Sequence, residues 1–315
     1  MISVVIPVYN SQESLEELHR RLTHVLQAYG SEYEIIFIND GSKDNSGEVI
    51  AELRRKDNYV KFIDLSRNFG AQAAISAGLK YASGDAVAIM DDDLQDPPEL
   101  LPHFLDKMKD GYEVIYGIIK GRKENVIIRA SYYLFYRILS RLSKIEVPLD
   151  AGDFCVISRK VVNAMNRMPE SNRYLRGLRS WVGFRQIGIE YERAKRHSGK
   201  SGYSLGGYFR FALDGIFSFS YAPLRLATIA GFTIAILSFI IGFKAIIPKI
   251  LGNQAVPGFP ALFVAITFIG GVQLITIGLI GEYVARIYDE TKKRPHYVIN
   301  NMKGFASESS ETKSH

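Results

Sequence analysis

Three consecutive aspartates stand in the stretch DDDLQDPPEL, which occupies residues 91–100 and follows the apolar run AVAIM. Along an extended chain the side chains of residues i and i+2 point the same way. We therefore expect Asp91 and Asp93 to share one side, with Gln95 continuing it, and Asp92 to face away. Carboxylate and amide oxygens are hard ligands that suit Mg²⁺ or Mn²⁺. The spacing thus indicates a divalent-metal site. For the stretch taken alone, an ordinary acidic turn is the alternative.

Apolar runs alternate with helical patterns through the first hundred residues. Strands are predicted for ISVVIPVYN, YEIIFIND, VKFIDLS and GDAVAIM, and helices for residues 11–30, 42–56 and 71–82. In the first helix, which we expect to begin near Ser11, apolar residues recur at helical spacing. Strand and helix in alternation are typical of an α/β fold whose mainly parallel, Rossmann-like sheet is covered on both faces.

Each predicted strand ends in a polar loop. These loops are PVYN at 7–10, NDGS at 39–42, SRNFG at 66–70 and the acidic run itself. Ligands of open α/β sheets bind beyond the carboxyl ends of the strands. The four loops are therefore expected to converge on one edge of the sheet, which favours a binding site over an isolated turn.

Two uncharged apolar segments, residues 226–243 and 259–281, lie in the last third of the chain. As helices they would measure about 27 and 34 Å, close to the roughly 30 Å thickness of a hydrocarbon core. We predict a two-helix transmembrane hairpin within residues 223–282; a buried hairpin of a soluble protein is the alternative. Glycines in the second segment permit close helix association, so a homo-oligomer is compatible with the sequence.

Basic residues flank the apolar segments on their outer sides. Before the first stand Arg193, Lys195, Arg196, Lys200, Arg210 and Arg225; after the second stand Arg286, Lys292, Lys293 and Arg294; between them are only Lys244 and Lys249. The positive-inside rule then puts both termini, and the whole of residues 1–200, in the cytoplasm. The formal net charge is +6, a mild excess, and we expect no nucleic-acid partner. The single Cys155 excludes intramolecular disulfides.

Two further segments are predicted to form amphipathic helices at the membrane surface. Residues 125–144 intersperse arginines with an apolar side, and residues 201–222 are aromatic-rich and lead into the first apolar segment. Basic, aromatic amphipathic helices commonly lie in the bilayer interface; packing on the soluble domain is the alternative. Residues 283–315 are expected to form a cytoplasmic tail whose polar end, FASESSETKSH, is disordered.

The motifs VVIPVYN, NDGSKDNS, RNFGAQAAISAG, DDDLQDPPE, AGDF and RHSGKSGYSL, followed by two apolar segments, resemble the polyprenyl-phosphate glycosyltransferases of glycosyltransferase family 2. These membrane enzymes include bactoprenol glucosyltransferases and dolichyl-phosphate mannose synthases. The resemblance covers nearly the whole chain. It implies a GT-A domain over residues 1–200, a juxtamembrane helix over 201–222, and a multi-pass protein of the bacterial inner membrane.

The resemblance also implies a reaction. A sugar moves from a nucleotide-diphosphate donor to a polyprenyl phosphate, such as undecaprenyl phosphate, at the cytoplasmic membrane face, with inversion at the anomeric carbon and with a divalent cation, Mg²⁺ or Mn²⁺. Glucose from UDP-glucose is the expected donor; mannose, N-acetylhexosamine and aminoarabinose donors are alternatives.

Roles carry over residue by residue. The implied nucleotide contacts are Pro7, Tyr9, Asn10, Asp40, Asn68, Asp91 and Asp92, and the implied metal ligands are Asp91, Asp93 and Gln95, with Asp93 also counted as catalytic. The acceptor is a phosphate monoester, whose second pKa near 6 leaves it largely a dianion at neutral pH. It needs positioning cations more than a strong base. For that role we expect Arg122, Arg129, Arg196 and Ser201.

Two rival functions are weighed against this one. A processive polysaccharide synthase would resemble the chain at the nucleotide site, but usually carries a Gln-x-x-Arg-Trp motif, whereas Trp181 lies in RSWVGF. A non-catalytic membrane scaffold would not be expected to keep the acidic run intact.

Overall fold

The computed structural model describes residues 1–120, 151–168, 170, 173–193 and 258–305, with scattered residues between 224 and 240. The chain divides into two compact units. We call them the sheet unit (Met1–Tyr136, Ile145–Tyr208 and Pro295–His315) and the helical unit (Arg137–Lys144 and Phe209–Arg294). The predicted interfacial segments 125–144 and 201–222, and most of the first predicted span, lie outside the described residues.

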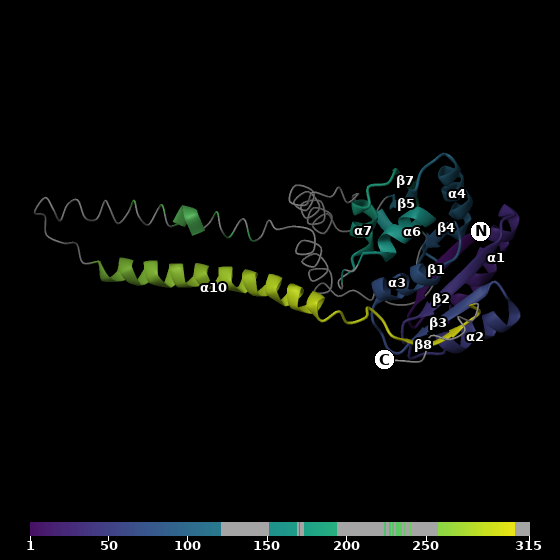
Figure 1. Ribbon diagram of the computed structural model, residues 1–315, viewed down its shortest axis with the longest axis horizontal. Coiled ribbons are helices and arrows are strands. Elements are labelled where there is room, and N and C mark those ends of the chain that lie inside the picture. Colours follow the sequence, from purple (N-terminus) through teal and green to yellow (C-terminus); the bar gives the residue numbers. More distant parts are fainter. Residues whose placement is uncertain are drawn as a thin grey trace, which may run out of the picture. The chain divides into compact units, whose positions relative to one another are not determined.

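An eight-stranded sheet forms the centre of the sheet unit, with strand order β7-β5-β6-β4-β1-β2-β3-β8 (Figure 1). Its strands are β1 (Ile2–Val8), β2 (Tyr33–Asn39), β3 (Val60–Leu65), β4 (Ala86–Ile89), β5 (Val114–Ile119), β6 (Ala151–Ser158), β7 (Gln186–Tyr191) and β8 (Ile299–Lys303). β1 to β4 are parallel, as are β5 and β7. β6 and β8 run antiparallel to their neighbours. The predicted α/β fold is confirmed, and the sheet is mixed.

Helices cover both faces of this sheet. They are α1 (Leu15–Tyr29), α2 (Ser46–Lys56), α3 (Ala71–Tyr81), η1 (Pro98–Leu100), α4 (Leu101–Lys109), α6 (Arg159–Asn166) and α7 (Leu175–Trp181). α1 packs with α2 and α4 over one face, and α3 packs with β1, β2 and α6 on the other. Alternate residues of the buried strands serve the two faces. α1 begins at Leu15 with Ser14 as its N-cap, a little later than the expected start near Ser11, because the Ser14 hydroxyl donates to the Ser11 carbonyl and completes a turn there (3.0 Å).

Pro7 lies inside the central strand β1, where a proline would normally cost a ladder hydrogen bond. The Val5 carbonyl accepts from Met90 on the β4 side, so the Pro7 nitrogen, two residues on, faces the same side. The β1–β4 register ends at Val5 and Ile89. The missing N–H therefore falls where β4 has already ended.

The chain returns to the sheet unit after the long helix of the helical unit. β8 pairs with β3, and the Asn300 amide donates to Asp64 (2.8 Å). Asp64 also accepts from Asn39 of β2 (2.8 Å), so three strands are joined at this point. The expected cytoplasmic tail, residues 283–315, thus contains the end of α10 and a strand of the sheet. INNMK is too short and too polar to predict a strand.

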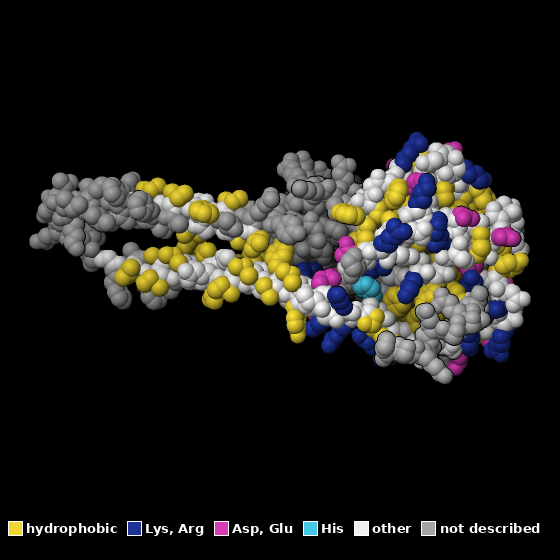
Figure 2. Space-filling model, in the orientation of Figure 1, with side chains coloured by type: hydrophobic (Ala, Val, Ile, Leu, Met, Phe, Trp, Pro, Cys, Tyr) yellow, Lys and Arg dark blue, Asp and Glu magenta, His cyan; other side chains and the backbone are white. Residues whose placement is uncertain are grey.

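α10 (Phe259–Thr291) is the described part of the helical unit that bears on the membrane prediction. Large apolar side chains are exposed along its length, among them Leu262, Ile266, Leu274, Ile275, Ile277 and Ile287 (Figure 2). A stretch of it, Phe268–Thr291, is long and apolar enough to cross a membrane, and no other helix in the described part of the chain meets that test. α10 contains the second predicted span and continues beyond its predicted end at residue 281. Two transmembrane helices stay a prediction.

A buried ion pair joins β2 to β3 near the start of both strands. Glu34 of β2 is 1% exposed and pairs with Lys61 of β3. Its carboxylate also accepts from the Ser3 hydroxyl and from the backbone N–H (2.7 Å) and hydroxyl (2.9 Å) of Ser83. Burial alone would raise the pKa of Glu34, but these partners outweigh it and hold the pKa below its ordinary value of 4.5.

Glu34→Gln should therefore destabilise the fold by about 3 kcal/mol, because it leaves the Lys61 ammonium without its countercharge. The charged form of Glu34 contributes stability above its ordinary pKa of 4.5, and this is lost as the pH falls through the lower pKa of the folded state. The difference in melting temperature between wild type and variant should be full at neutral pH and shrink in acid. Glu17→Gln, which breaks an exposed pair with Arg20, is the matched control and should change the melting temperature little. An equal effect of both substitutions at every pH would contradict this role of Glu34.

Candidate active site

The loops that follow β1, β2, β3 and β4 meet at one edge of the sheet. The Asp40 N–H, just after β2, donates to the Val8 carbonyl at the end of β1 (2.9 Å). The Tyr9 N–H, just after β1, donates to the Asp92 carboxylate in the acidic run (3.3 Å). The predicted convergence of these loops thus has direct hydrogen-bonded contacts.

Asp40 ties the loop after β3 to the end of β2. Its Oδ1 accepts from the N–H of Phe69 (2.7 Å) and its Oδ2 from that of Gly70 (2.8 Å), and the residue is 2% exposed. Burial raises the pKa of Asp40, although the two N–H groups oppose that rise. Its carboxylate positions the 66–70 loop. The contact between Asp40 and a nucleotide stays a prediction.

Gly41 allows the closest approach between two of these loops. Its φ of +64° is in the left-handed region, and a Cβ there would overlap the backbone carbonyl carbon of Arg67 and lie 2.5 Å from the backbone nitrogen of Asn68. Only glycine fits this position, because both the conformation and the space exclude a side chain.

The remaining predicted nucleotide residues differ in exposure. Pro7 is buried, whereas Tyr9 is 45% exposed and Asn68 is also exposed. Asn10 adopts a φ of 54°, which asparagine tolerates, and its side chain accepts from the Lys43 N–H (2.8 Å). Tyr9 and Asn68 therefore offer side chains to a ligand at this edge, while Pro7 and Asn10 shape the loops around it.

The acidic run leaves the sheet instead of extending β4. β4 ends at Ile89, and Leu94 takes a φ of 60° while keeping only 5% exposure. A bulky residue in this region is uncommon and costs roughly 1–3 kcal/mol, which burial of the leucine offsets. Asp92 and Asp91 have different partners: Asp92 anchors the loop after β1 by accepting from the Tyr9 N–H, whereas Asp91 contacts Arg193. The opposite orientation of the two side chains stays a prediction.

Three carboxylates lie around Asp91, which makes a cluster of four. The antiparallel pairing of β4 with β6 ends at Ile89 and Cys155, which brings Asp153, two residues before Cys155, close enough to Asp91 for their charges to interact. Burial of the carboxyl group and then the nearby charges of Asp96, Asp153 and Asp93 raise the pKa of Asp91. The side chain of Asp91 keeps 38% exposure, so the cluster is open to solvent at this residue.

Two guanidinium groups and one phenol offset part of this negative charge. Arg193 contacts Asp91 (3.2 Å) and Asp96 (3.3 Å), and the Tyr191 hydroxyl donates to Asp96 (2.5 Å). Arg176 forms a two-point pair with Asp153 (2.7 and 2.8 Å). Burial opposes ionisation of Asp153, but Arg176 lowers its pKa nonetheless.

Sequence reasoning missed these partners. Asp96 stands within the quoted acidic run and could have been noticed there, and Asp153 lies in the AGDF motif. No local pattern marks Arg176, Tyr191 or Arg193, because their approach depends on how β5, β6 and β7 are ordered.

No group of three or more His, Cys, Asp or Glu side chains in the described residues has the arrangement of a metal site. The donor chemistry nevertheless fits a divalent cation at Asp91 and Asp93, because among the described residues the four carboxylates outnumber the guanidinium groups of Arg176, Arg179 and Arg193 that act on them. Mg²⁺ and Mn²⁺ sites of this kind complete their shells with water and substrate phosphates, so few protein ligands suffice. The Asp93 carboxylate also accepts from the Gln95 N–H (3.1 Å), which holds these two predicted ligands together.

The residues expected to position the acceptor phosphate lie outside the described part of the chain; they are Arg122, Arg129, Arg196 and Ser201.

Residues 3–165 match the family model of Glycosyl transferase family 2. Similar proteins include an uncharacterized glycosyltransferase of Synechocystis sp., 42% identical over 304 residues and covering 96% of each chain. A prophage bactoprenol glucosyl transferase homolog of Escherichia coli is 39% identical over 303 residues, covering 96% of this chain and 99% of its own. The bactoprenol glucosyl transferase of Shigella phage SfV is 40% identical with the same coverage.

Among solved structures, glucosyl-3-phosphoglycerate synthase from Mycobacterium tuberculosis, in complex with Mn²⁺, UDP-glucose and phosphoglyceric acid, is 18% identical with a TM-score of 0.48. It covers 69% of this chain and 79% of that one. This likeness is too distant to inform the function. The family match and the α/β sheet together support a GT-A-like fold.

Gly41→Ala should disturb the candidate site as well as the stability of the fold, because the new Cβ pushes the loops after β2 and β3 apart. Gly30→Ala is the matched control: Gly30 also has a positive φ, of +74°, but nothing lies within 4 Å of its Cβ position. The control should cost roughly 1–2 kcal/mol from backbone strain alone. Gly41→Ala should cost more in thermal melting and should also raise the KM for the nucleotide donor. Equal melting temperatures with an unchanged KM would show that the Gly41 contact does not matter.

Proposed function

The chain belongs to glycosyl transferase family 2, and from that premise we propose that it moves glucose from UDP-glucose to a polyprenyl phosphate such as undecaprenyl phosphate. The product is a polyprenyl-phosphate glucose with an inverted anomeric carbon. That the chain is a glycosyltransferase follows from the family. The choice of glucose and of a lipid acceptor is supported by the relatives named bactoprenol glucosyl transferase, which align over nearly their whole length.

The observation that carries the reaction is the surplus of carboxylates at the edge where the loops after β1 to β4 meet. Asp91 faces Asp93, Asp96 and Asp153 there, and it is partly open to solvent. A cluster of this charge suits a cation that binds a pyrophosphate, since the substrate supplies the remaining oxygen ligands.

Asp91 and Asp93, with Gln95, would hold a divalent cation, Mg²⁺ or Mn²⁺. When bound, it neutralises the charge that grows on the leaving nucleotide diphosphate. The exposed Tyr9 and Asn68 would contact the nucleotide, and Asp92 would keep the loop after β1 in place through the Tyr9 N–H. Asp40 and Gly41 would act by fixing the loops on the other side of the site.

The acceptor reacts through its phosphate oxygen, which is largely dianionic at neutral pH and attacks the sugar carbon without a strong general base. Two anionic partners must be brought together, so cations are needed to position them. We assign that role to Arg122, Arg129 and Arg196, with Ser201, from the sequence resemblance. These residues flank or belong to the segments expected at the membrane surface.

A membrane location follows from the acceptor, which is a lipid. We propose two transmembrane helices, with the sheet unit and both termini on the cytoplasmic side of a bacterial inner membrane, and with residues 125–144 and 201–222 in the interface. The exposed apolar surface of α10 and the basic residues that follow it support this arrangement.

The purified enzyme in vesicles should release nucleotide diphosphate from UDP-glucose only when polyprenyl phosphate and a divalent cation are both present. A chelator should abolish the release, and added Mg²⁺ or Mn²⁺ should restore it, because the leaving group needs charge neutralisation. Parallel assays with GDP-mannose, UDP-N-acetylglucosamine and an aminoarabinose donor would test the sugar. Activity that survives chelation would exclude the metal; release that needs no lipid would favour a polysaccharide synthase.

Asp91→Asn should lower the turnover by about 100-fold or more and weaken Mn²⁺ binding, since it removes a charged ligand. Asp92→Asn keeps an oxygen that can accept from the Tyr9 N–H. It should therefore cost less than about tenfold in turnover and leave Mn²⁺ binding almost unchanged. Calorimetry with Mn²⁺, run beside the transfer assay, separates the two roles. An equal loss of Mn²⁺ binding in both variants would contradict the assignment of Asp91 as the ligand and Asp92 as the loop anchor.

A further inference from the structure

Trp181, the single tryptophan of the chain, is the last residue of α7 and is exposed at the surface of the sheet unit. It is 62% exposed, the largest fraction among the large apolar side chains of the sheet unit that the structure describes. The next are Tyr59 at 53% and Val298 at 48%. Tryptophan is a large, mostly apolar side chain with one N–H donor, and it favours places where one part is wet and the other is not.

The exposure of Trp181 is not the result of a loosely held helix. Leu175 and Leu178 of α7 are 4% and 3% exposed, so the helix itself is packed into the unit. The Leu175 N–H donates to the Gln72 side chain (2.9 Å), and Arg176 is fixed by Asp153. α7 therefore holds Trp181 outward on a firm support.

The chain that leaves α10 joins the sheet unit close to the start of α7. Burial and then Tyr81 raise the pKa of Tyr297 to about 12, and the charge of Arg173 opposes this rise, so Tyr297 lies near Arg173. Arg173 stands two residues before Leu175, the first residue of α7. From Thr291, where α10 ends, to Tyr297 are only a few residues, which reach at most about 21 Å when fully extended. α7 itself rises about 9 Å along its axis.

This short connection limits how far α7 can be from a bilayer that α10 crosses. The connection also carries Lys292, Lys293 and Arg294, whose positive charges favour anionic headgroups. Tryptophan is enriched at the headgroup level of membrane proteins, with its ring among the upper acyl groups and its N–H in the polar region.

We propose that Trp181 inserts into the headgroup region of an anionic lipid bilayer and forms a membrane contact of the sheet unit, separate from the apolar spans. The proposal rests on the proposed function in one respect, that α10 crosses the membrane. Arg176, five residues before Trp181 on α7, rises about 7.5 Å from it along the helix and pairs with Asp153 of the acidic cluster. The contact thus keeps the acidic cluster near headgroup level, where the phosphate of a polyprenyl phosphate lies.

Because the chain has one tryptophan, its intrinsic fluorescence reports on this position without any mutation. The full chain is reconstituted into vesicles of phosphatidylcholine and phosphatidylglycerol, and into matched vesicles whose lipids are brominated either close to the headgroup or near the acyl end. We expect the shallow bromines to quench the emission more than the deep ones. We also expect the emission in the vesicles to be blue-shifted from that of a tryptophan in water, and acrylamide quenching to fall below that of a tryptophan fully exposed to water.

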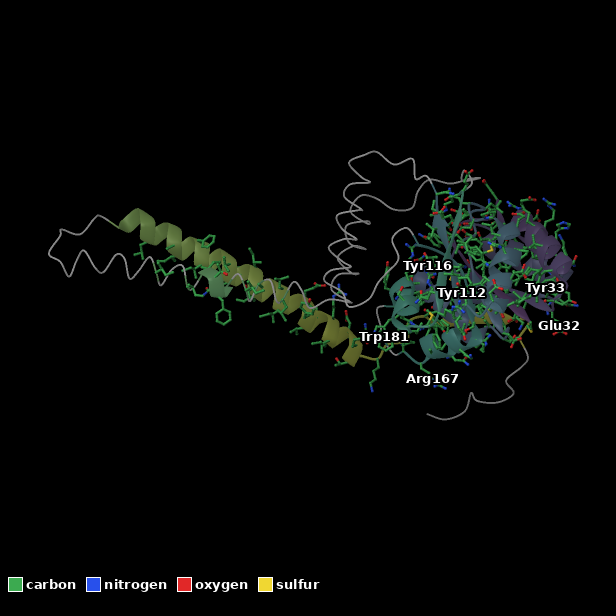
Figure 3. The ribbon with its side chains drawn as sticks, turned by 90° about the horizontal axis from the view of Figure 1, so that it is seen from above. Glu32, Tyr33, Tyr112, Tyr116, Arg167 and Trp181 are labelled. Atoms are coloured by element: carbon green, nitrogen blue, oxygen red, sulfur yellow. The ribbon has the colours of Figure 1, made fainter. Side chains whose placement is uncertain are left out.

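A second protein moves the reporter to the other end of the sheet unit. In Figure 3, Trp181 and Tyr33 lie at opposite ends of that unit. The Tyr59 ring packs on Tyr33 at 4.6 Å between centroids and is exposed, so the double variant Trp181→Phe, Tyr59→Trp carries a tryptophan far from the proposed contact. Its emission should be insensitive to bromines at either depth.

Flotation of the vesicles separates the possible failures. Protein that floats but shows no bromine quenching at Trp181, or equal quenching in the double variant, overturns the membrane contact while leaving the span and the proposed function standing. Quenching by acrylamide that falls without any bromine effect indicates a second protein chain as the occupant and also overturns the contact. Protein that does not float overturns both the contact and the membrane part of the proposed function.

The contact also predicts a kinetic effect. Trp181→Ala should raise the apparent KM for polyprenyl phosphate in vesicles and leave the KM for UDP-glucose unchanged, whereas Trp181→Phe, which keeps an aromatic ring, should restore most of the difference. A rise in both KM values together, or no rescue by phenylalanine, would assign Trp181 to the stability of α7 instead.

Discussion

Four parallel strands end at the same edge of the sheet, and the site depends on that constraint. β1 to β4 are hydrogen-bonded in register, so the loops that follow them meet although they lie far apart in the sequence. Side-chain carboxylates then hold the loops together by accepting hydrogen bonds from backbone N–H groups. The Asp40 carboxylate holds the 66–70 loop, and the Asp92 carboxylate holds the loop after β1. The close backbone approach at Gly41 completes this arrangement. Asp40, Gly41 and Asp92, which belong to the predicted nucleotide-binding motifs, therefore position the loops.

The acidic cluster is a second consequence of sheet order. β6 enters antiparallel beside β4 and brings Asp153 opposite Asp91, and β7 beside β5 brings Tyr191 and Arg193 to the same place. Like charges at this spacing repel, and burial makes the repulsion stronger. Arg176 and Arg193 offset part of it. The net negative charge that remains is expected of a site that binds a cation together with an anionic substrate and releases both after the reaction.

The proposed substrates, a soluble nucleotide sugar and a lipid acceptor, would impose opposite demands on one enzyme. The donor would need a hydrated, polar edge such as the one formed by the loops after β1 to β4, whereas the acceptor phosphate would be confined to the height of the headgroups. α7 bears on both requirements. Its Arg176 pairs with Asp153 of the acidic cluster, and its last residue, Trp181, is exposed for the proposed membrane contact. β8 adds to this, because the chain that returns from α10 becomes part of the same sheet.

The sequence by itself determined the strand–helix alternation and the polar loops after each strand, because these follow from local periodicity. It also determined the apolar character of α10. Only the tertiary structure decided that β6 lies between β4 and β5, that β8 closes the β3 edge, and that Asp96, Asp153, Arg176 and Arg193 surround Asp91. Those contacts join residues as far as 102 positions apart. Local patterns cannot specify them, since the order and direction of strands in a sheet are set by packing of the whole unit.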